Sequence, residues 1–351
     1  MQAARTNVTF LLSVRLLRTN TNRNIVKEGN MNSSLSVGAK MAVFLGLAIV
    51  FGATMIGLSG RARSFQQGEI GNSGNEKRFD KSFTVSPGGK LVIRADDGSI
   101  TVSGTDSKEV SIHVLARGSE SLLKKFDVRF DQNNNTVKVE SRLRRNYLNF
   151  CWDNDLDVQY DVQVPTDFNL DLNTAGGDLT ILGVKGRIDG ETSGGNLELS
   201  KLDGTVRMST SGGNVNVRES TGDCKIETSG GSIQGVSIVG SMDFESSGGD
   251  IDVKESDGKL RASTSGGNVR VALKDNKGID LETSGGNLVV RLPKAISADV
   301  KAETTGGDVS CDFQFSGKLK DGSFDGKING GGNLIRLETS GGDIVINSIE
   351  L

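Results

Sequence analysis

Aspartates that follow paired glycines come closest, among the residues of this chain, to a known metal-binding pattern. The segment 248–253 (GGDIDV) is similar to the calcium-binding repeat G-G-x-G-x-D. However, Ile251 replaces the next glycine of that pattern and Val253 replaces its aspartate. Calcium requires several converging oxygens, and Asn or Ser takes the Asp250 position in other copies. No metal or other cofactor is predicted, and the aspartates interpreted as turn residues are Asp178, Asp250, Asp308 and Asp343.

Catalytic groups are otherwise scarce. His113 is the only histidine, so one chain cannot supply a triad or a metal cluster built on several histidines. It lies in a predicted strand beside Ile112 and Val114, and we interpret it as structural. Carboxylates are abundant, but the short repeats described below leave no long loops to form a substrate cleft. We therefore predict a protein that is not an enzyme, with a polysaccharide-active β-helix enzyme as a remote alternative.

Residues 142–157 (RLRRNYLNFCWDNDLD) combine arginines with aromatic side chains in a chain that is only 5% aromatic. This combination favours recognition of a protein or a glycan. The alternative is that the aromatic side chains cover the end of the fold while the arginines remain in solvent. The candidate binding residues are Arg142, Arg144, Arg145, Tyr147, Phe150 and Trp152.

A strict repeat dominates the rest of the chain. Glycine pairs begin at residues 176, 194, 212, 230, 248 and 266, at intervals of 18, and later pairs begin at 285, 306 and 341. Each pair precedes a short run of alternating apolar residues, such as Val215 and Val217, and a second run follows, such as Cys224 and Ile226. Alternation with a period of two predicts strands with one buried face. Each unit therefore contains two short strands and two turns.

Stacked units of this length predict an all-β fold, a parallel β-helix or solenoid with two sheets and 18-residue coils. Glycine is expected where φ is positive or where successive coils pass closely, and we expect both at Gly213 and Gly249. Two columns of polar residues should satisfy turn backbone groups and one another. The hydroxyl column contains Thr192, Thr210, Thr228, Ser246, Thr264 and Thr283, and the amide column contains Asn196, Asn214, Ser232, Asp250, Asn268 and Asn287.

Composition limits the possible partners. The 351 residues carry 41 basic and 44 acidic side chains, a formal net charge of −3, and the two signs are interspersed along the repeats. This pattern argues against a nucleic-acid groove. Three cysteines do not make a disulfide framework: Cys224 is expected in the core, and a bond between Cys151 and Cys311 is left open.

The N-terminal part contains the one membrane signal. Residues 1–40 are basic and are expected to be disordered, with Met31 and Met41 as other possible starts. Residues 41–60 (MAVFLGLAIVFGATMIGLSG) approach the length of a transmembrane helix. They predict a single N-terminal hydrophobic helix, either an uncleaved membrane anchor or a cleaved signal sequence. The preceding positive charge places the rest of the chain outside the cytoplasm, anchored at the membrane or, after cleavage, secreted or periplasmic.

Three further regions complete the predicted organisation. Residues 61–78 are interpreted as a linker, residues 79–172 as a less regular β region that caps the solenoid, and residues 173–351 as the repeats. Within the cap, 91–104 is expected to form a hairpin around Asp97-Gly98, and 119–126 a short helix with Ser119 as its N-cap. Residues 311–333 break the period and predict a protruding loop or hairpin.

The final segment, 341–351 (GGDIVINSIEL), is apolar and nearly uncharged. As an edge strand it would offer unpaired backbone groups to a partner. It is expected either to be covered by residues 311–333 or to pair with another chain, which includes self-association through this edge.

The order of these segments resembles the bacterial "putative adhesin" family, also known as the toastrack domain of envelope-stress systems. The similar segments are 83–104 (FTVSPGGKLVIRADDGSITVSG), 157–181 (DVQYDVQVPTDFNLDLNTAGGDLTI), the repeated TSGG units and 328–346 (INGGGNLIRLETSGGDIVI). The resemblance implies an exported β-solenoid that acts as an adhesin-like scaffold for an envelope protein or glycan. The alternative is an accessory module that senses envelope stress with a membrane partner. No catalytic residues are implied.

Overall fold

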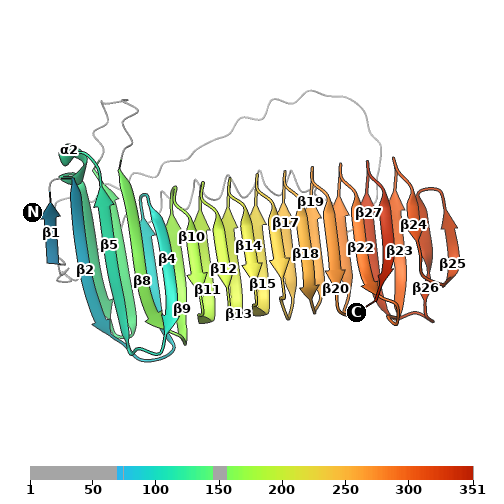
Figure 1. Ribbon diagram of the computed structural model, residues 1–351, viewed down its shortest axis with the longest axis horizontal. Coiled ribbons are helices and arrows are strands. Elements are labelled where there is room, and N and C mark those ends of the chain that lie inside the picture. Colours follow the sequence, from blue (N-terminus) through green and yellow to red (C-terminus); the bar gives the residue numbers. More distant parts are fainter. Residues whose placement is uncertain (1–68, 74, 145–155, 351) are drawn as a thin grey trace, which may run out of the picture. The chain divides into compact units, whose positions relative to one another are not determined.

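The computed structural model describes residues 69–73, 75–144 and 156–350 (Figure 1). The basic segment 1–40 and the hydrophobic helix predicted over 41–60 lie outside these residues. In the part that is described, no helix has the length and apolar character needed to cross a membrane.

Two sheets, A and B, of fourteen strands each contain most of the described residues. The prediction of an all-β fold with two sheets is confirmed. In spatial order, sheet B contains β1 (Glu69–Ser73), β2 (Glu76–Thr84), β5 (Glu109–Arg117), β8 (Asp157–Pro165), β4 (Ser99–Thr105), β10 (Leu179–Leu182), β12 (Leu197–Ser200), β14 (Val215–Arg218), β16 (Ile233–Val236), β18 (Ile251–Ser256), β20 (Val269–Leu273), β22 (Leu288–Pro293), β28 (Ile344–Ile349) and β24 (Val309–Cys311). Sheet A contains β25 (Phe315–Lys320), β26 (Ser323–Ile328), β23 (Ala298–Thr304), β27 (Asn333–Thr339), β21 (Ile279–Thr283), β19 (Leu260–Thr264), β17 (Met242–Ser246), β15 (Thr221–Thr228), β13 (Asp203–Thr210), β11 (Lys185–Thr192), β9 (Phe168–Thr174), β3 (Gly89–Ala95), β7 (Thr136–Leu143) and β6 (Phe126–Asn133).

The central coils stack with the register that the glycine period requires. In sheet B, Leu179 lies opposite Leu197, and Leu197 lies opposite Val215, so each step advances 18 residues. In sheet A, Val206 lies opposite Cys224 with the same offset. These side chains are buried between the sheets. Because parallel strands place equivalent residues side by side, one coil's apolar pattern fixes the register of the next.

The core accommodates large side chains where a neighbouring position is glycine. A Cβ atom on Gly190 would lie 2.6 Å from Sδ of Met208, the residue beside it in sheet A. A Cβ atom on Gly235 would lie 3.0 Å from a ring carbon of Phe244 in the opposite sheet. Both large side chains are fully enclosed. A glycine thus leaves room for a large side chain on the next coil or in the opposite sheet, which maintains close packing despite the irregular sequence.

The hydroxyl column is confirmed, and its hydrogen bonds go to the backbone. The Thr210 hydroxyl donates to the carbonyl oxygen of Gly195 in the preceding coil at 2.8 Å. It also accepts from the N–H of Gly213 in its own turn at 3.2 Å. The same pair of bonds recurs at Thr192, Thr228, Ser246, Thr264 and Thr283. Each buried hydroxyl therefore closes its own turn and joins it to the previous coil.

The amide column is confirmed as well. Oδ1 of Asn196 accepts a hydrogen bond from the backbone N–H of Asn214 at 2.9 Å, and Asn214 does the same for Ser232. The Asp178 carboxylate accepts from the N–H of Asn196 at 2.6 Å. Asp178 therefore lies in a turn, where any short side chain with an acceptor oxygen can accept the hydrogen bond from the backbone N–H of the next coil.

Glycines serve two different purposes in the two turns of a coil. Gly204 and Gly222 have positive φ values of 132° and 112°. The second glycine of each pair does not have a positive φ, so that part of the reason expected for Gly213 and Gly249 is wrong. Instead, a Cβ atom on Gly213 would lie 1.9 Å from the carbonyl oxygen of Gly195. Close passage of successive coils is what requires glycine there.

The N-terminal region departs from the sequence prediction in three places. Residues 91–104 do not form a hairpin, because β3 lies in sheet A beside β9 while β4 lies in sheet B beside β10. They form one coil, because β3 pairs with parallel neighbours in sheet A and β4 pairs with parallel neighbours in sheet B. Part of the 61–78 linker is also ordered as strand, with β1 and the start of β2 antiparallel. The helix is shorter than expected: α2 covers only Glu120–Leu123, and Ser119 precedes it without a side-chain capping bond.

The last coil in the sequence is not the last coil in space (Figure 1). Strand β27 lies between β21 and β23, and β28 lies between β22 and β24. Ile344 and Ile346 are fully buried. The prediction that 341–351 is an open edge strand is therefore wrong, because β24 pairs with Ile344–Ile346. The start of the segment 311–333 takes part in this cover, since Cys311 ends β24 and the backbone N–H of Asp312 donates to the carbonyl oxygen of Ile346 at 3.1 Å.

Residues 311–333 contain the predicted hairpin, formed by β25 and β26. Strand β26 pairs with β23, and β25 is the edge of sheet A. Phe313 turns inward at the start of this segment and is buried. Cys311 is half-buried at the end of β24, whereas Cys151 lies outside the described residues, so a bond between them stays a prediction.

Candidate functional site

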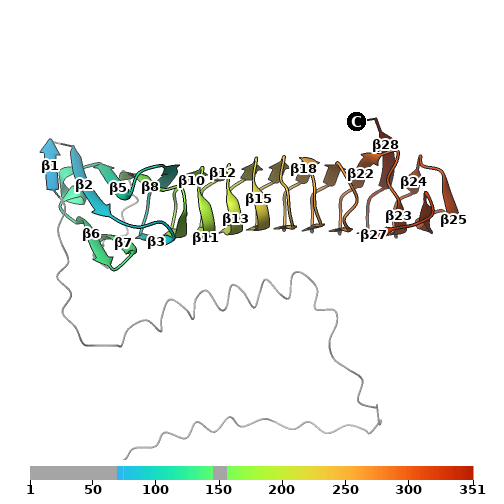
Figure 2. The ribbon, with the colours of Figure 1, turned by 90° about the horizontal axis from the view of Figure 1, so that it is seen from below.

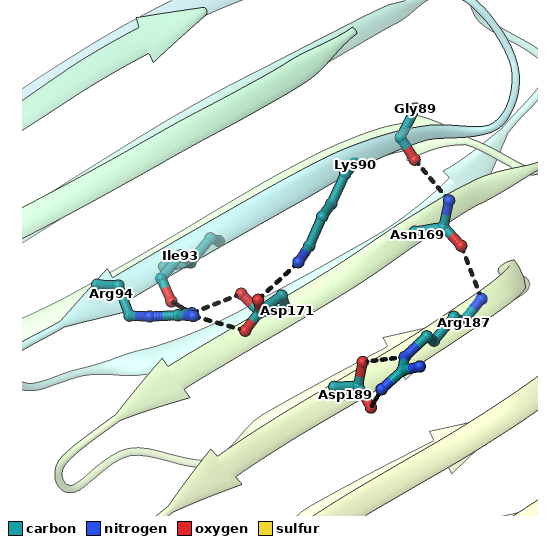
Figure 3. Close-up of polar contacts among 8 residues, drawn as sticks. All are labelled: Gly89, Lys90, Ile93, Arg94, Asn169, Asp171, Arg187 and Asp189. Carbon is teal, nitrogen blue, oxygen red and sulfur yellow. Dashed lines mark hydrogen bonds and ion pairs between the residues drawn. The ribbon is translucent and has the colours of Figure 1, made fainter. Parts of the chain in front are cut away.

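Charged side chains on the outer face of sheet A pair with one another, both between adjacent strands and within a strand (Figure 3). Asp171 on β9 accepts from Lys90 at 2.8 Å and from Arg94 at 2.7 Å, both on β3. Burial alone would raise the pKa of Asp171, but these two cations outweigh it and the pKa is lowered. On the next strand, Arg187 pairs with Asp189 at 2.6 Å. The carboxylates on this part of the face are therefore neutralised.

The pairing continues along the sheet. Lys225 contacts Glu227 at 2.8 Å, and Arg336 contacts Glu338 at 2.6 Å. Such exposed pairs contribute little to stability. They do, however, cancel the local charge. A ligand of opposite charge would therefore be attracted mainly to an unpaired group on this face.

Two arginines near the N-terminal edge of sheet A lack such a partner. Arg142, on β7, and Arg144, directly after β7, are both exposed. Neither guanidinium forms an ion pair within residues 69–73, 75–144 and 156–350. The backbone N–H of Arg144 donates to the carbonyl oxygen of Lys125 at 3.1 Å, which fixes its main chain. These two residues lie at the start of the segment 142–157 that sequence analysis selected.

A hollow of about 160 Å³ lies beside these arginines on the outer face of β6 and β7. Its lining residues are Asp127, Arg129, Glu140, Arg142 and Arg144. The two carboxylates already have cations, because Arg129 contacts Asp127 at 3.4 Å and Lys138 pairs with Glu140. The hollow therefore has an excess of positive charge from Arg142 and Arg144. Paired guanidiniums beside a small hollow are suited to a carboxylate or another compact anion.

The structure places only two of the six residues that sequence analysis selected. Arg145, Tyr147, Phe150 and Trp152 lie outside the described residues. Sequence analysis missed the opposite wall of the hollow, which Asp127 and Arg129 form. Only the antiparallel pairing of β6 with β7 brings this wall beside Arg142, and no local signal in the sequence indicates it.

The comparisons with known proteins bear on the fold that carries this site. A family model described as Toastrack DUF4097 matches residues 89–347. The chain belongs to the toastrack family. The match begins at β3 and ends within β28, so it covers every coil of the toastrack stack described above. A search of curated proteins finds no match.

Three solved structures are similar to this toastrack chain. A "putative cell adhesion protein" from Clostridium sporogenes is 15% identical, with a TM-score of 0.22, over 78% of this chain and 100% of that one. A "putative adhesin" from Bacteroides fragilis is 12% identical, with a TM-score of 0.38, over 80% and 100%. Another from Parabacteroides merdae is 12% identical, with a TM-score of 0.34, over 78% and 96%. Membership in the family follows from the family model alone, because these TM-scores are low.

Other reactive groups of the toastrack solenoid are dispersed. Nδ1 of His113 lies 2.7 Å from Oδ1 of Asp80, and both side chains are exposed on the outer face of sheet B. Cys224 is in the core as expected, and burial raises its thiol pKa to about 12. No group of three histidine, cysteine or acidic side chains suited to a metal ion occurs within the described ranges.

One carboxyl group on the outer face of the toastrack stack gives a pH-dependent prediction. Burial raises the pKa of Glu245 above its ordinary value of 4.5, and the nearby Asp243 adds to this. The folded state therefore holds this proton more tightly than the unfolded state. The resulting stabilisation is complete below pH 4.5 and is lost as the pH rises through the folded-state pKa.

We therefore expect Glu245→Gln to be more stable than the wild type at neutral pH, by less than about 1 kcal/mol because the group is only half-buried. The difference should disappear in acid. Urea unfolding at neutral and acidic pH measures both values. Asp171→Asn is the control, because the pKa of Asp171 is lowered by its pairs with Lys90 and Arg94, so its removal should not stabilise the protein at neutral pH. A Glu245→Gln protein less stable than the wild type at neutral pH would contradict this account.

Proposed function

We propose that this toastrack protein is a non-enzymatic, exported protein of the cell envelope whose β-solenoid acts as an adhesin-like binding scaffold. Residues 41–60, with the basic residues before them, support attachment to the membrane or export across it. The stacked coils support a rigid scaffold, since each coil is bonded to its neighbours in both sheets.

The unpaired arginines carry the binding part of this proposal. On an outer face where cations and carboxylates cancel, Arg142 and Arg144 leave an excess of positive charge beside a hollow. A partner with a matching compact anion would gain charge-assisted hydrogen bonds without displacing an existing ion pair. An acidic glycan of the envelope has this chemistry, because its carboxylates are spaced along an extended polar chain.

A binding assay with immobilised polygalacturonate as the acidic probe and dextran as the neutral probe tests this function. We expect the full-length protein in mild detergent to bind the acidic polymer and not dextran. Arg142→Ala/Arg144→Ala should weaken binding at least tenfold, since a single bond to a charged group is worth about 1.5–3 kcal/mol and about 1.4 kcal/mol is a factor of ten. Arg187→Ala, which removes a cation already paired on the same face, should bind normally.

Equal loss in the Arg187→Ala variant, or equal binding of dextran, would show that the two arginines do not form the site. Export has its own test, because cell fractionation places the protein in the membrane, the exported fraction or the cytoplasm. Recovery from the cytoplasm alone would overturn the envelope assignment while leaving the binding result intact.

A further inference from the structure

At each end of the solenoid one sheet extends further than the other, and the sheet that extends further differs between the two ends. Among the described residues, sheet B continues beyond the β3–β4 coil through four strands, β8, β5, β2 and β1, whereas sheet A continues through two, β7 and β6. At the other end, sheet A continues beyond the β23–β24 coil through β26 and β25, and sheet B ends at β24. Figure 2 shows β1 as the outermost strand at one end and β25 at the other.

These extensions are complementary between two copies of the chain. If the β25 end of one copy met the β6 end of the next, each sheet would contain four strands between the flanking coils. Sheet A would contribute β26, β25, β6 and β7, and sheet B would contribute β1, β2, β5 and β8. The number of strands in the two sheets would therefore match across the junction.

The strand directions also agree at both junctions. Strand β25 runs parallel to β23, because each is antiparallel to β26, and β6 is antiparallel to β7, which is parallel to β3. A β25–β6 junction is therefore antiparallel. The same reasoning makes a β24–β1 junction antiparallel, since β1 is antiparallel to β2. Antiparallel pairing forms well between edge strands from separate chains.

Charged side chains lie on the outer faces of the two sheet A edges. On β25, Lys318 and Lys320 are exposed and have no ion-pair partner among the described residues. The outer face of β6 carries Asp127, Arg129 and Asp131, and Arg129 contacts Asp127 at 3.4 Å. The lysines oppose pairing of β25 with another β25, a common protection of edge strands, whereas β6 offers them two carboxylates and only one cation.

Apolar residues line the other face of both edges. Phe315 and Leu319 are each 37% exposed, which is high for side chains that face the interior of the stack. The inner face of β6 carries Phe126 and Phe130, which are buried. A β25–β6 junction would extend this apolar row and cover Phe315 and Leu319, so association would remove apolar surface from water.

The geometry points to head-to-tail assembly of this chain, with β25 of one copy pairing with β6 of the next. Such a contact uses different surfaces on the two copies and therefore propagates into a filament rather than closing as a dimer.

Cysteine cross-linking in the full-length protein tests the contact directly. We expect Asp127→Cys/Lys318→Cys to give a ladder of trimers and larger species on a non-reducing gel. Each single variant should give no new ladder relative to the wild type, which controls for Cys151 and Cys311. A double variant that stops at the dimer, or that gives no product, would overturn the head-to-tail contact.

Charge reversal tests the chemistry of the same contact. Lys318→Glu/Lys320→Glu and Asp127→Lys/Asp131→Lys should each weaken self-association at least tenfold in sedimentation experiments, with unchanged circular dichroism. Mixing the two variants should restore association, because each then offers the charge that the other lacks. Association that is unaffected by either reversal, or a wild type that stays monomeric at all concentrations, would refute the proposal.

Discussion

Replacing Gly213 by alanine is expected to reduce the free energy of unfolding by about 3 kcal/mol, the upper part of the range for overpacked interiors. The added Cβ atom would lie 1.9 Å from the carbonyl oxygen of Gly195, far inside van der Waals contact. That oxygen belongs to the backbone of the preceding coil, so no side chain can rotate away. Valine should be worse still. Thermal and urea unfolding measure the loss.

The chain offers a matched control one residue away. A Cβ atom on Gly212 would have its nearest neighbour at 3.7 Å, an ordinary contact, and Gly212 does not have a positive φ. We expect Gly212→Ala to stay within about 1 kcal/mol of the wild type. If the two alanine variants unfold alike, the close passage of coils is not what requires glycine at 213.

Deletion of residues 333–351 should be more damaging than deletion of the longer segment 294–351. The shorter deletion removes β27 and β28, the strands that connect β21 and β22 to β23 and β24. The β23–β24 coil and the β25–β26 hairpin would then be attached only through the chain. We expect lower thermal stability and rapid proteolysis within 294–332.

The longer deletion removes these elements together and leaves a contiguous stack that ends at β21 and β22. It should therefore remain resistant to protease over residues 75–144 and 156–293, apart from fraying of its exposed last coil. The opposite ranking would mean that β23 and β24 can move onto β21 and β22 and close the space, and that the inserted coil is dispensable.

Local periodicity explains how much of this fold was predictable. The strands, the two sheets, the hydroxyl column at Thr210 and the buried position of Cys224 all follow from one 18-residue unit and its copies. Each such feature depends on neighbours one coil away, so the repeated sequence pattern is enough to predict it. The β25–β26 hairpin was predictable because it interrupts that period.

The features that sequence analysis missed depend on contacts between distant segments. Residues 91–104 read locally as a hairpin, but their partners are β9 and β10, more than one coil's length further along the chain. Likewise, nothing in 341–351 indicates that β28 inserts between β22 and β24. For the candidate site, Arg142 and Arg144 were recognisable by type, whereas the wall that β6 forms required the three-dimensional pairing.

The uniform register between β11 and β17 has a consequence for how the length of the solenoid can change in evolution. Units such as 191–208 and 209–226 make the same contacts with the coils on either side. A further copy of such a unit would make the same contacts with the coils on either side. It would move the two ends of the stack about 4.8 Å further apart, which is one strand spacing. Unequal recombination between repeats therefore lengthens or shortens the protein in small equal steps, while the arginine hollow at one end and the open β25 edge at the other stay unaltered.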